Sequence, residues 1–168
     1  YNKYKKMNSI IYPRHIWWKI RPHIDYGTIE FRVCDAQRSL KNVSLIAAIS
    51  QALVYQSIKD YENKNLHQTF NLDLLNDGLW KAARFDFNAY IYDEPTNKIL
   101  KMKELIKIMQ DYCSESLALY KNEFVHSYLE NILDSGAESS KQLEVYNEGG
   151  FEVLKKFLVD NVSYTIGE

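Results

Sequence analysis

An alternation of apolar and polar residues with a period of two marks the beginning of the chain. It runs through residues 16–23 (IWWKIRPH) and again through residues 28–35 (TIEFRVCD), which predicts two β-strands. The residues between them end in Gly27, which can adopt a positive φ, so we expect a hairpin with a four-residue loop. The register that matches the two apolar faces pairs Ile20 with Phe31 and places Arg21 opposite Glu30.

The hydrophobic period becomes helical after residue 38. Ser39 is a candidate N-cap for a helix that ends near residue 61 and is apolar on nearly every side in its middle, which predicts burial. Few further strands are expected, and the remaining helices are predicted over residues 73–85, 102–120, 124–136 and 151–159. The fold class is therefore α+β, an antiparallel β-hairpin followed by a mostly helical C-terminal part.

An isolated two-stranded hairpin is marginally stable in water. The hairpin is therefore predicted to belong to a larger sheet whose other strands lie upstream of this segment or on another subunit. Within the hairpin, Trp18 is predicted to lie in the core and Cys34 to be a buried small hydrophobic residue.

Composition narrows the classes of function. The 168 residues are 46% hydrophobic, which is enough for one domain with a core. The net charge of −1 argues against a sequence-independent nucleic-acid binder, and no apolar run approaches the about 20 residues of a membrane span. The chain opens on Tyr1 without a signal segment and has two cysteines, so we expect a cytoplasmic protein and, because Met is absent at the start, a fragment.

The candidate chemistry lies on the second predicted strand. Glu30 and Arg32 are two residues apart and so share one face of that strand. A carboxylate there can hold a divalent cation while the guanidinium contacts an anionic oxygen of the same ligand, as in sites where Mg²⁺ is bound with phosphate oxygens. The alternative is structural, a cross-strand salt bridge between Arg21 and Glu30.

Residues 16–23 and 27–36 (GTIEFRVCDA) closely resemble the signature of the carboxylate–amine ligases of the glutamate–cysteine ligase type 2 family. Further pieces follow in the family's order: residues 79–84 (LWKAAR), Gly136, Gln142, residues 145–146 and the pair Gly149–Gly150. The resemblance covers nearly the whole chain, and its hairpin portion is the most specific.

The resemblance implies a relative of glutamine synthetase that uses ATP and Mg²⁺ to form an amide through a γ-glutamyl phosphate intermediate. By that resemblance the hairpin belongs to a glutamine synthetase-like catalytic sheet, Glu30 is a Mg²⁺ ligand and Arg32 steadies the transferred phosphoryl group as the catalytic residue. Arg21, His23 and Arg84 match motif positions and are expected to contact the nucleotide or a substrate carboxylate. One departure is Lys141, which stands where the family has an arginine and puts a bidentate contact there in doubt.

The resemblance also implies substrates and partners. These are glutamate and an amine such as cysteine, as in glutathione biosynthesis, with a homodimer suggested and no nucleic acid or membrane. The family is about twice as long as this chain, so residues 1–168 are expected to be a single domain, the C-terminal portion of a larger catalytic domain. Without the N-terminal half, the chain is expected to be inactive. The alternative is a catalytically silent binding or oligomerisation domain that retains the fold.

Overall fold

The computed structural model describes residues 1–66 and 70–162, and the chain divides into two compact units. Unit 1 comprises Tyr1–Gln37, and unit 2 begins at Arg38. Helices dominate the structure and two short antiparallel hairpins accompany them, which confirms the α+β class with a helical C-terminal part. That residues 1–168 are one portion of a larger catalytic domain stays a prediction.

Unit 1 is built around the predicted hairpin. Its elements are α1 (Asn2–Lys6), the 3₁₀ helix η1 (Pro13–His15), β1 (Ile20–His23) and β2 (Thr28–Phe31). The strands pair Ile20 with Phe31 and Arg21 with Glu30, which confirms the predicted register. Residues 24–27 form the loop, and Gly27 has a φ of +61° as expected. The strands are shorter than predicted, although the Arg32 N–H still donates to the Lys19 carbonyl, at 2.8 Å, just beyond them.

The apolar face of this hairpin is exposed. Trp18 is 45% exposed, Ile20 50% and Ile29 51%, and Ile16 is the one buried hydrophobic residue in unit 1. The prediction that Trp18 lies in the core is therefore wrong, and so is the predicted burial of Cys34, which is exposed. Both predictions fail because the one helix beside Trp18 in unit 1 is α1, whose Tyr4 ring meets Trp18 at a centroid distance of 6.1 Å but which, at five residues, is too short to cover the hairpin.

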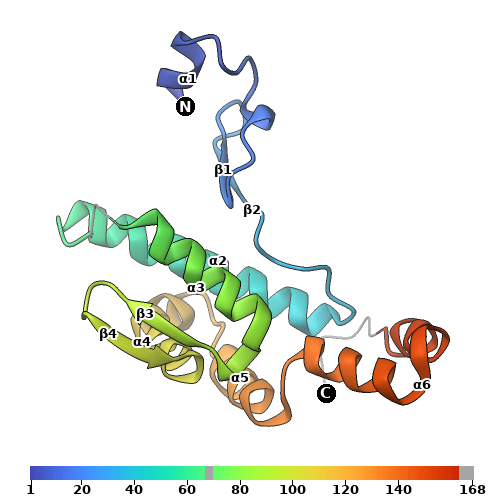
Figure 1. Cartoon of the computed structure of the whole chain (residues 1–168). Coiled ribbons are helices and arrows are strands. Elements are labelled where there is room, and N and C mark those ends of the chain that lie inside the picture. The colour runs from blue at the N-terminus through green and yellow to red at the C-terminus, as the bar shows by residue number, and fades with distance from the viewer. Residues whose placement is uncertain (67–69, 163–168) are drawn as a thin grey trace. The chain divides into compact units, whose positions relative to one another are not determined.

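Unit 2 has a helical core. Its helices are α2 (Leu40–Glu62), α3 (Leu72–Phe85), α4 (Met102–Leu119), α5 (Phe124–Ser135) and α6 (Glu138–Asp160). Figure 1 shows α2 running past α4 and α5, and the buried side chains between these three helices form one cluster: Leu45, Ala48, Ala52, Cys113, Leu117, Val125 and Leu129. Ser39 is the N-cap residue of α2 as predicted. The small Ala48 and Ala52 side chains allow the helices to approach closely.

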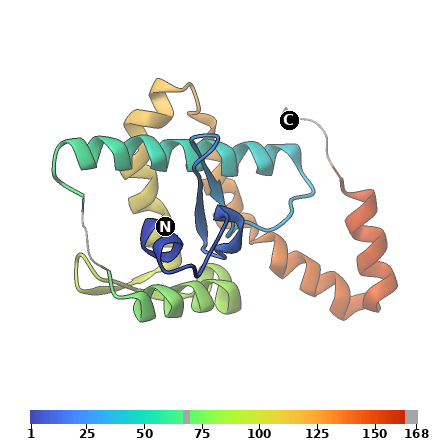
Figure 2. The same ribbon diagram turned by 90° about the horizontal axis from the view of Figure 1, so that it is seen from above.

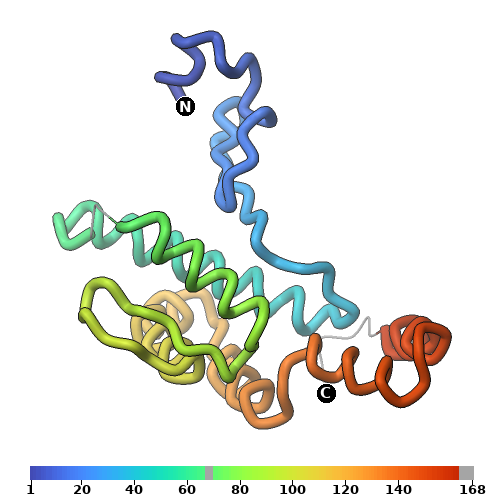
Figure 3. Tube along the Cα trace, in the orientation of Figure 1, coloured from blue at the N-terminus to red at the C-terminus, as the bar shows by residue number. Residues whose placement is uncertain are grey.

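A second hairpin, β3 (Tyr90–Asp93) with β4 (Lys98–Lys101), lies between α3 and α4 in the sequence. Figure 3 traces the chain from α3 through the 3₁₀ helix η2 (Asp86–Asn88) into this hairpin. The expectation of few further strands missed it. The side chain of Asn71 caps α3 by accepting the Asp73 N–H at 2.9 Å. A Cβ at Gly78 would lie 3.4 Å from Ile91 Cγ2, so α3 packs directly on β3.

Helix α6 begins earlier than predicted and contains a sharp bend. Gly150 has a non-helical φ of 71°, and the helix that follows corresponds to the predicted one at residues 151–159. Figure 2 shows the two segments of α6 at an angle to each other. Arg38 connects them, because its Nε donates to Glu138 at 2.6 Å and its Nη1 to the Asn161 carbonyl at 3.0 Å. Across the described ranges, no helix has the length and apolar character needed to cross a bilayer.

Candidate functional site

The hairpin of unit 1 brings Arg21, Glu30 and Arg32 together on one face. Arg21 Nε donates to Glu30 Oε2 at 2.7 Å, and Arg21 Nη2 lies 2.5 Å from the same oxygen. The other carboxylate oxygen, Glu30 Oε1, lies 3.6 Å from Arg32 Nε. One carboxylate therefore stands between two guanidinium groups, and the salt bridge considered as the structural alternative is present.

Arg21 is held by the backbone as well as by Glu30. Its Nη1 donates to the Arg14 carbonyl at 3.1 Å and, at 3.5 Å, to the Ile16 carbonyl. The side chain is 17% exposed. Because several of its donors are used within unit 1, Arg21 is suited to orient Glu30. Arg14 and Ile16 take part through carbonyl groups, which a side-chain pattern does not reveal.

Arg32 is less constrained. Its Cζ lies 5.8 Å from the centroid of the Trp17 ring, and Trp17 itself is 83% exposed. The distance to Glu30 Oε1 exceeds that of a short ion pair, so Arg32 retains donors that can turn to an anionic ligand. Trp17 is a flat apolar surface beside that guanidinium, at the range of a cation–π contact.

His23 lies two residues from Arg21 on β1 and so shares its side of the strand. Its ring stacks on Tyr26, with centroids 4.5 Å apart and an interplanar angle of 29°. His23 Nδ1 is buried and has no hydrogen-bond partner among the described residues. Buried polar atoms are nearly always paired, so an unpaired ring nitrogen indicates a place for a ligand atom or a water. Sequence reasoning missed Tyr26, whose only signal is an aromatic residue next to the loop glycine.

Arg84 belongs to unit 2. It is exposed on α3, and its Cζ lies 5.9 Å from the centroid of the Phe85 ring. The part of the site that unit 1 forms by itself consists of Arg21, His23, Glu30 and Arg32.

The metal-binding capacity of this site is small. In residues 1–66 and 70–162, no group of three or more His, Cys, Asp or Glu side chains is placed to hold a metal ion. Glu30 Oε1 keeps acceptor capacity, so Glu30 fits the role of one ligand in a set completed by phosphate oxygens, waters or other acidic residues.

The buried thiol of unit 2 is not part of this chemistry. Burial raises the pKa of Cys113, whose side chain lies in the core between α2, α4 and α5. A raised thiol pKa keeps the group neutral and unreactive.

Comparison with known proteins agrees with the family resemblance of the sequence. A "Putative glutamate--cysteine ligase 2" of Solibacter usitatus is 25% identical over 158 residues, which are 94% of this chain and 41% of that protein. A protein of the same name from Gloeobacter violaceus is 32% identical over 143 residues, 83% of this chain and 38% of that protein. The one from Chloroflexus aggregans is 28% identical over 135 residues, 80% of this chain and 35% of that protein.

This chain thus spans about two fifths or less of the length of the curated relatives it matches. The family description "Glutamate-cysteine ligase family 2 (GCS2)" matches residues 2–156, which include both hairpins and all six α-helices at least in part. The chain belongs to glutamate–cysteine ligase family 2.

Proposed function

We propose that this chain is part of an ATP-dependent carboxylate–amine ligase that forms an amide through a γ-glutamyl phosphate. The observation that carries the proposal is the Glu30 carboxylate between the guanidinium groups of Arg21 and Arg32. An acyl phosphate needs charge neutralisation around a transferred phosphoryl group, and a guanidinium beside a carboxylate that can bind a cation supplies both signs.

Each residue has a distinct role in this proposal. Arg32 contacts the phosphoryl group and steadies it during transfer, because its donors are the least engaged. Arg21 orients Glu30 through its double contact with Oε2. His23 offers its Nδ1, which has no hydrogen-bond partner in the described part of the chain, to the nucleotide or to a substrate carboxylate, and Arg84 is a further candidate for such a contact.

Magnesium is the cofactor that this proposal requires together with ATP. When bound, Mg²⁺ neutralises phosphate charge, and Glu30 would be the residue of this chain that holds it. One carboxylate with a free oxygen is compatible with a metal that takes most of its ligands from phosphates and waters.

The isolated chain is proposed to be inactive. The relatives named above are more than twice as long as the segment they share with it, so more than half of their length has no counterpart in residues 1–168. The other ligands and much of the glutamate pocket are assigned to the part that these relatives have in addition. Glutamate and cysteine are the first substrates to test.

ADP release tests the proposal. The longest natural polypeptide that contains this segment would be supplied with Mg-ATP, glutamate and cysteine, beside its Glu30→Gln variant. We expect activity to fall at least about a hundredfold, the scale of a lost transition-state electrostatic contact. Glu152→Gln is the matched control, because Glu152 is an exposed glutamate on α6 in unit 2, and it should retain activity.

A catalytically silent domain would behave differently. A folded protein that neither binds Mg-ATP nor releases ADP with any amine would favour a binding or oligomerisation role. A folded protein that binds Mg-ATP in a Glu30-dependent way but releases no ADP would retain the proposed site and reject the substrates.

A further inference from the structure

A cavity of about 540 Å³ lies in unit 2 between α3 and the β3–β4 hairpin. Its wall is mostly apolar and aromatic, with Leu74 and Phe85 from α3, Tyr92 from β3 and Ile99 from β4. The volume is within the range of about 300–1,000 Å³ that is usual for small-molecule sites. All its lining residues belong to unit 2, and none is among the residues of the hairpin site.

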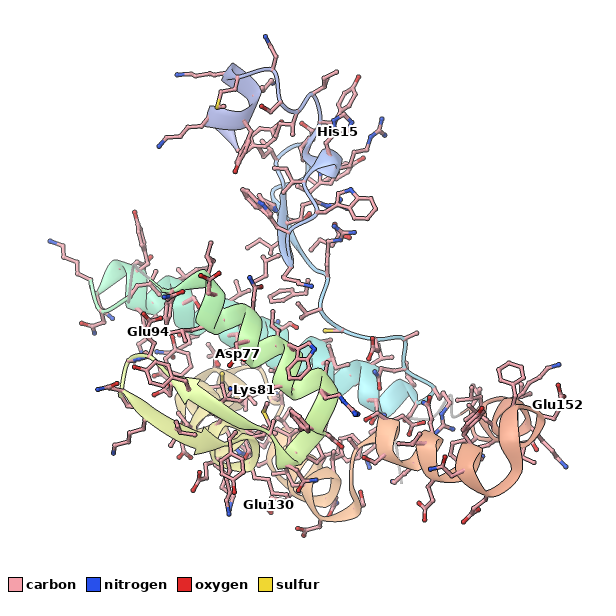
Figure 4. All side chains as sticks on the ribbon, viewed as in Figure 1. His15, Asp77, Lys81, Glu94, Glu130 and Glu152 are labelled. Atoms are coloured by element: carbon pink, nitrogen blue, oxygen red, sulfur yellow. The ribbon has the colours of Figure 1, made fainter. Side chains whose placement is uncertain are left out.

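An ion pair stands at this apolar cavity. Asp77 and Lys81 are one helical turn apart on α3, and Lys81 Nζ lies 2.6 Å from Asp77 Oδ2. Both line the cavity, and their side chains are 44% and 36% exposed. Figure 4 labels both residues on the part of α3 beside the β3–β4 hairpin. The pair has no net charge, but it presents a negative and a positive group side by side to whatever enters.

The other polar groups of the cavity differ in what they can still bind. The Tyr92 hydroxyl is already used, since it donates to Asn97 Oδ1 at 2.6 Å. Asn88 and Tyr90 also line the cavity, and neither side chain hydrogen-bonds to another described residue. An amide and a phenol are therefore available to a ligand in addition to the ion pair.

The charge pattern limits the class of ligand. A phosphate or nucleotide is disfavoured, because the Asp77 carboxylate would repel it from Lys81. A metal ion is disfavoured as well, because Asp77 is the one carboxylate among the lining residues and, with phosphates disfavoured here, nothing analogous to the phosphate oxygens proposed beside Glu30 would complete its ligand set. A ligand that carries both an ammonium and a carboxylate on one carbon matches the pair, with its ammonium at Asp77 and its carboxylate at Lys81.

We infer that this cavity binds a free α-amino acid with an aromatic or branched apolar side chain. The zwitterionic end of the ligand contacts Asp77 and Lys81, and its side chain lies on Phe85, Tyr90 and Ile99. Tyr90 is 53% exposed and Ile99 70%, so a ligand there removes apolar surface from water. The inference concerns binding alone and does not depend on the proposed ligase activity.

L-Phenylalanine is the probe for this site. The isotope-labelled 168-residue chain would be titrated with it while amide NMR signals are recorded. We expect shifts concentrated in α3 and the β3–β4 hairpin, with none in α5. Two analogues measure how much each charged group contributes to binding, because phenethylamine lacks the carboxylate and 3-phenylpropionate lacks the ammonium. Each should bind at least about fivefold more weakly, the scale of one lost charged hydrogen bond.

Variants test the same contacts from the protein side. Asp77→Asn and Lys81→Met should each weaken L-phenylalanine binding at least about fivefold. The matched control is Glu115→Gln, which breaks the Lys59–Glu115 ion pair between α2 and α4 and should leave binding unchanged. Unchanged thermal unfolding of each variant would show that the fold is retained.

Three outcomes would overturn the inference. The first is the absence of shifts up to the solubility limit of L-phenylalanine. The second is equal binding of 3-phenylpropionate or phenethylamine, which would remove the zwitterionic requirement. The third is binding that persists in both Asp77→Asn and Lys81→Met while the shifts stay in place, which would make the site purely apolar.

Discussion

Unit 1 carries the charged side chains of the candidate site but little hydrophobic core, whereas unit 2 contains the hydrophobic core. In unit 1 a carboxylate, two guanidiniums and a histidine nitrogen with no hydrogen-bond partner among the described residues gather on a hairpin, and Ile16, which precedes this hairpin, is the one buried hydrophobic residue of the unit. The other buried hydrophobic side chains among the described residues belong to unit 2, where most of them form one cluster between α2, α4 and α5. The site therefore depends on local turn geometry and ion pairs, whereas unit 2 depends on a core.

This difference predicts which property a substitution will change in each unit. A core residue in unit 2 is expected to act on the stability of the helical part. Substitution of a hairpin residue in unit 1 is expected to change binding or activity at the site. It should leave the global free energy of unfolding nearly unchanged, because little apolar surface is buried around the hairpin. The predictions below test that division.

The largest effect is expected from Leu117→Ala. Leu117 is 1% exposed at the centre of the core formed by α2, α4 and α5. Its truncation should lower the free energy of unfolding by roughly 2–5 kcal/mol, from lost burial and the cavity left behind. Urea denaturation followed by helical circular dichroism measures it. Leu119→Ala is the control, since Leu119 is 57% exposed on the same helix and should cost well under 1 kcal/mol, about 0.5 or less.

The reactivity of the two free cysteines allows the two units to be compared directly. Cys34 in unit 1 is exposed and Cys113 in unit 2 is buried, so iodoacetamide at pH 8 should modify Cys113 at least about tenfold more slowly. Mass spectrometry of the labelled peptides gives both rates. Equal rates would mean that the core of unit 2 opens readily.

The buried thiol of Cys113 also makes the stability of unit 2 depend on pH. Burial raises the pKa of Cys113 above its usual 9.0, so the unfolded chain ionises first as the pH rises. The stability that the neutral thiol contributes is therefore complete below pH 9.0 and is lost progressively as the pH rises through the raised value. Cys113→Ala should remove this loss, which thermal unfolding at several alkaline pH values would detect.

Arg38→Ala is expected to have an intermediate effect. It removes two hydrogen bonds that hold α6 and a contact in which Arg38 Cζ lies 4.5 Å from the centroid of the Phe157 ring. We expect a loss of about 1–2 kcal/mol. Faster hydrogen exchange should be confined to α6 and the beginning of α2. Lys156→Ala, an exposed change on the same helix, should leave exchange unaltered.

The smallest effect on global stability is expected from Gly27→Ala. The φ of +61° at this position costs a residue with a side chain about 1 kcal/mol. Hydrogen exchange in β1 and β2 should increase while the thermal midpoint of unit 2 stays constant. Asp25→Ala in the same loop is the control, because Asp25 is not at a positive φ. A fall in the thermal midpoint of unit 2 together with faster exchange in the hairpin would contradict the expectation that the two units respond separately.

The sequence predicted the hairpin of unit 1 well because two local signals agreed. Alternation fixed which residues share a face, and Gly27 fixed the loop, so the pairing of Arg21 with Glu30 followed. The exposure of Trp18 and Cys34 could not be read in the same way, because burial depends on a second layer of structure and not on alternation.

Unit 2 was predicted in part. Helices with an apolar stripe were found, whereas β3 and β4 were missed because four residues each give too short an alternation. The first segment of α6 was also missed. It contains no buried residue, and Glu138 meets Arg38 across 100 positions of sequence, which no local pattern encodes.

The span of the Arg38 contacts has a consequence for the order of folding. Arg38 joins residues 100 and 123 positions away, so these contacts require the closure of a loop that includes most of unit 2. Loop closure of that length is entropically costly and is rewarded only after the intervening helices have packed. We therefore expect the Arg38 contacts to form after the folding transition state. Their loss should accelerate unfolding of α6 and leave the refolding rate of the helical core unchanged.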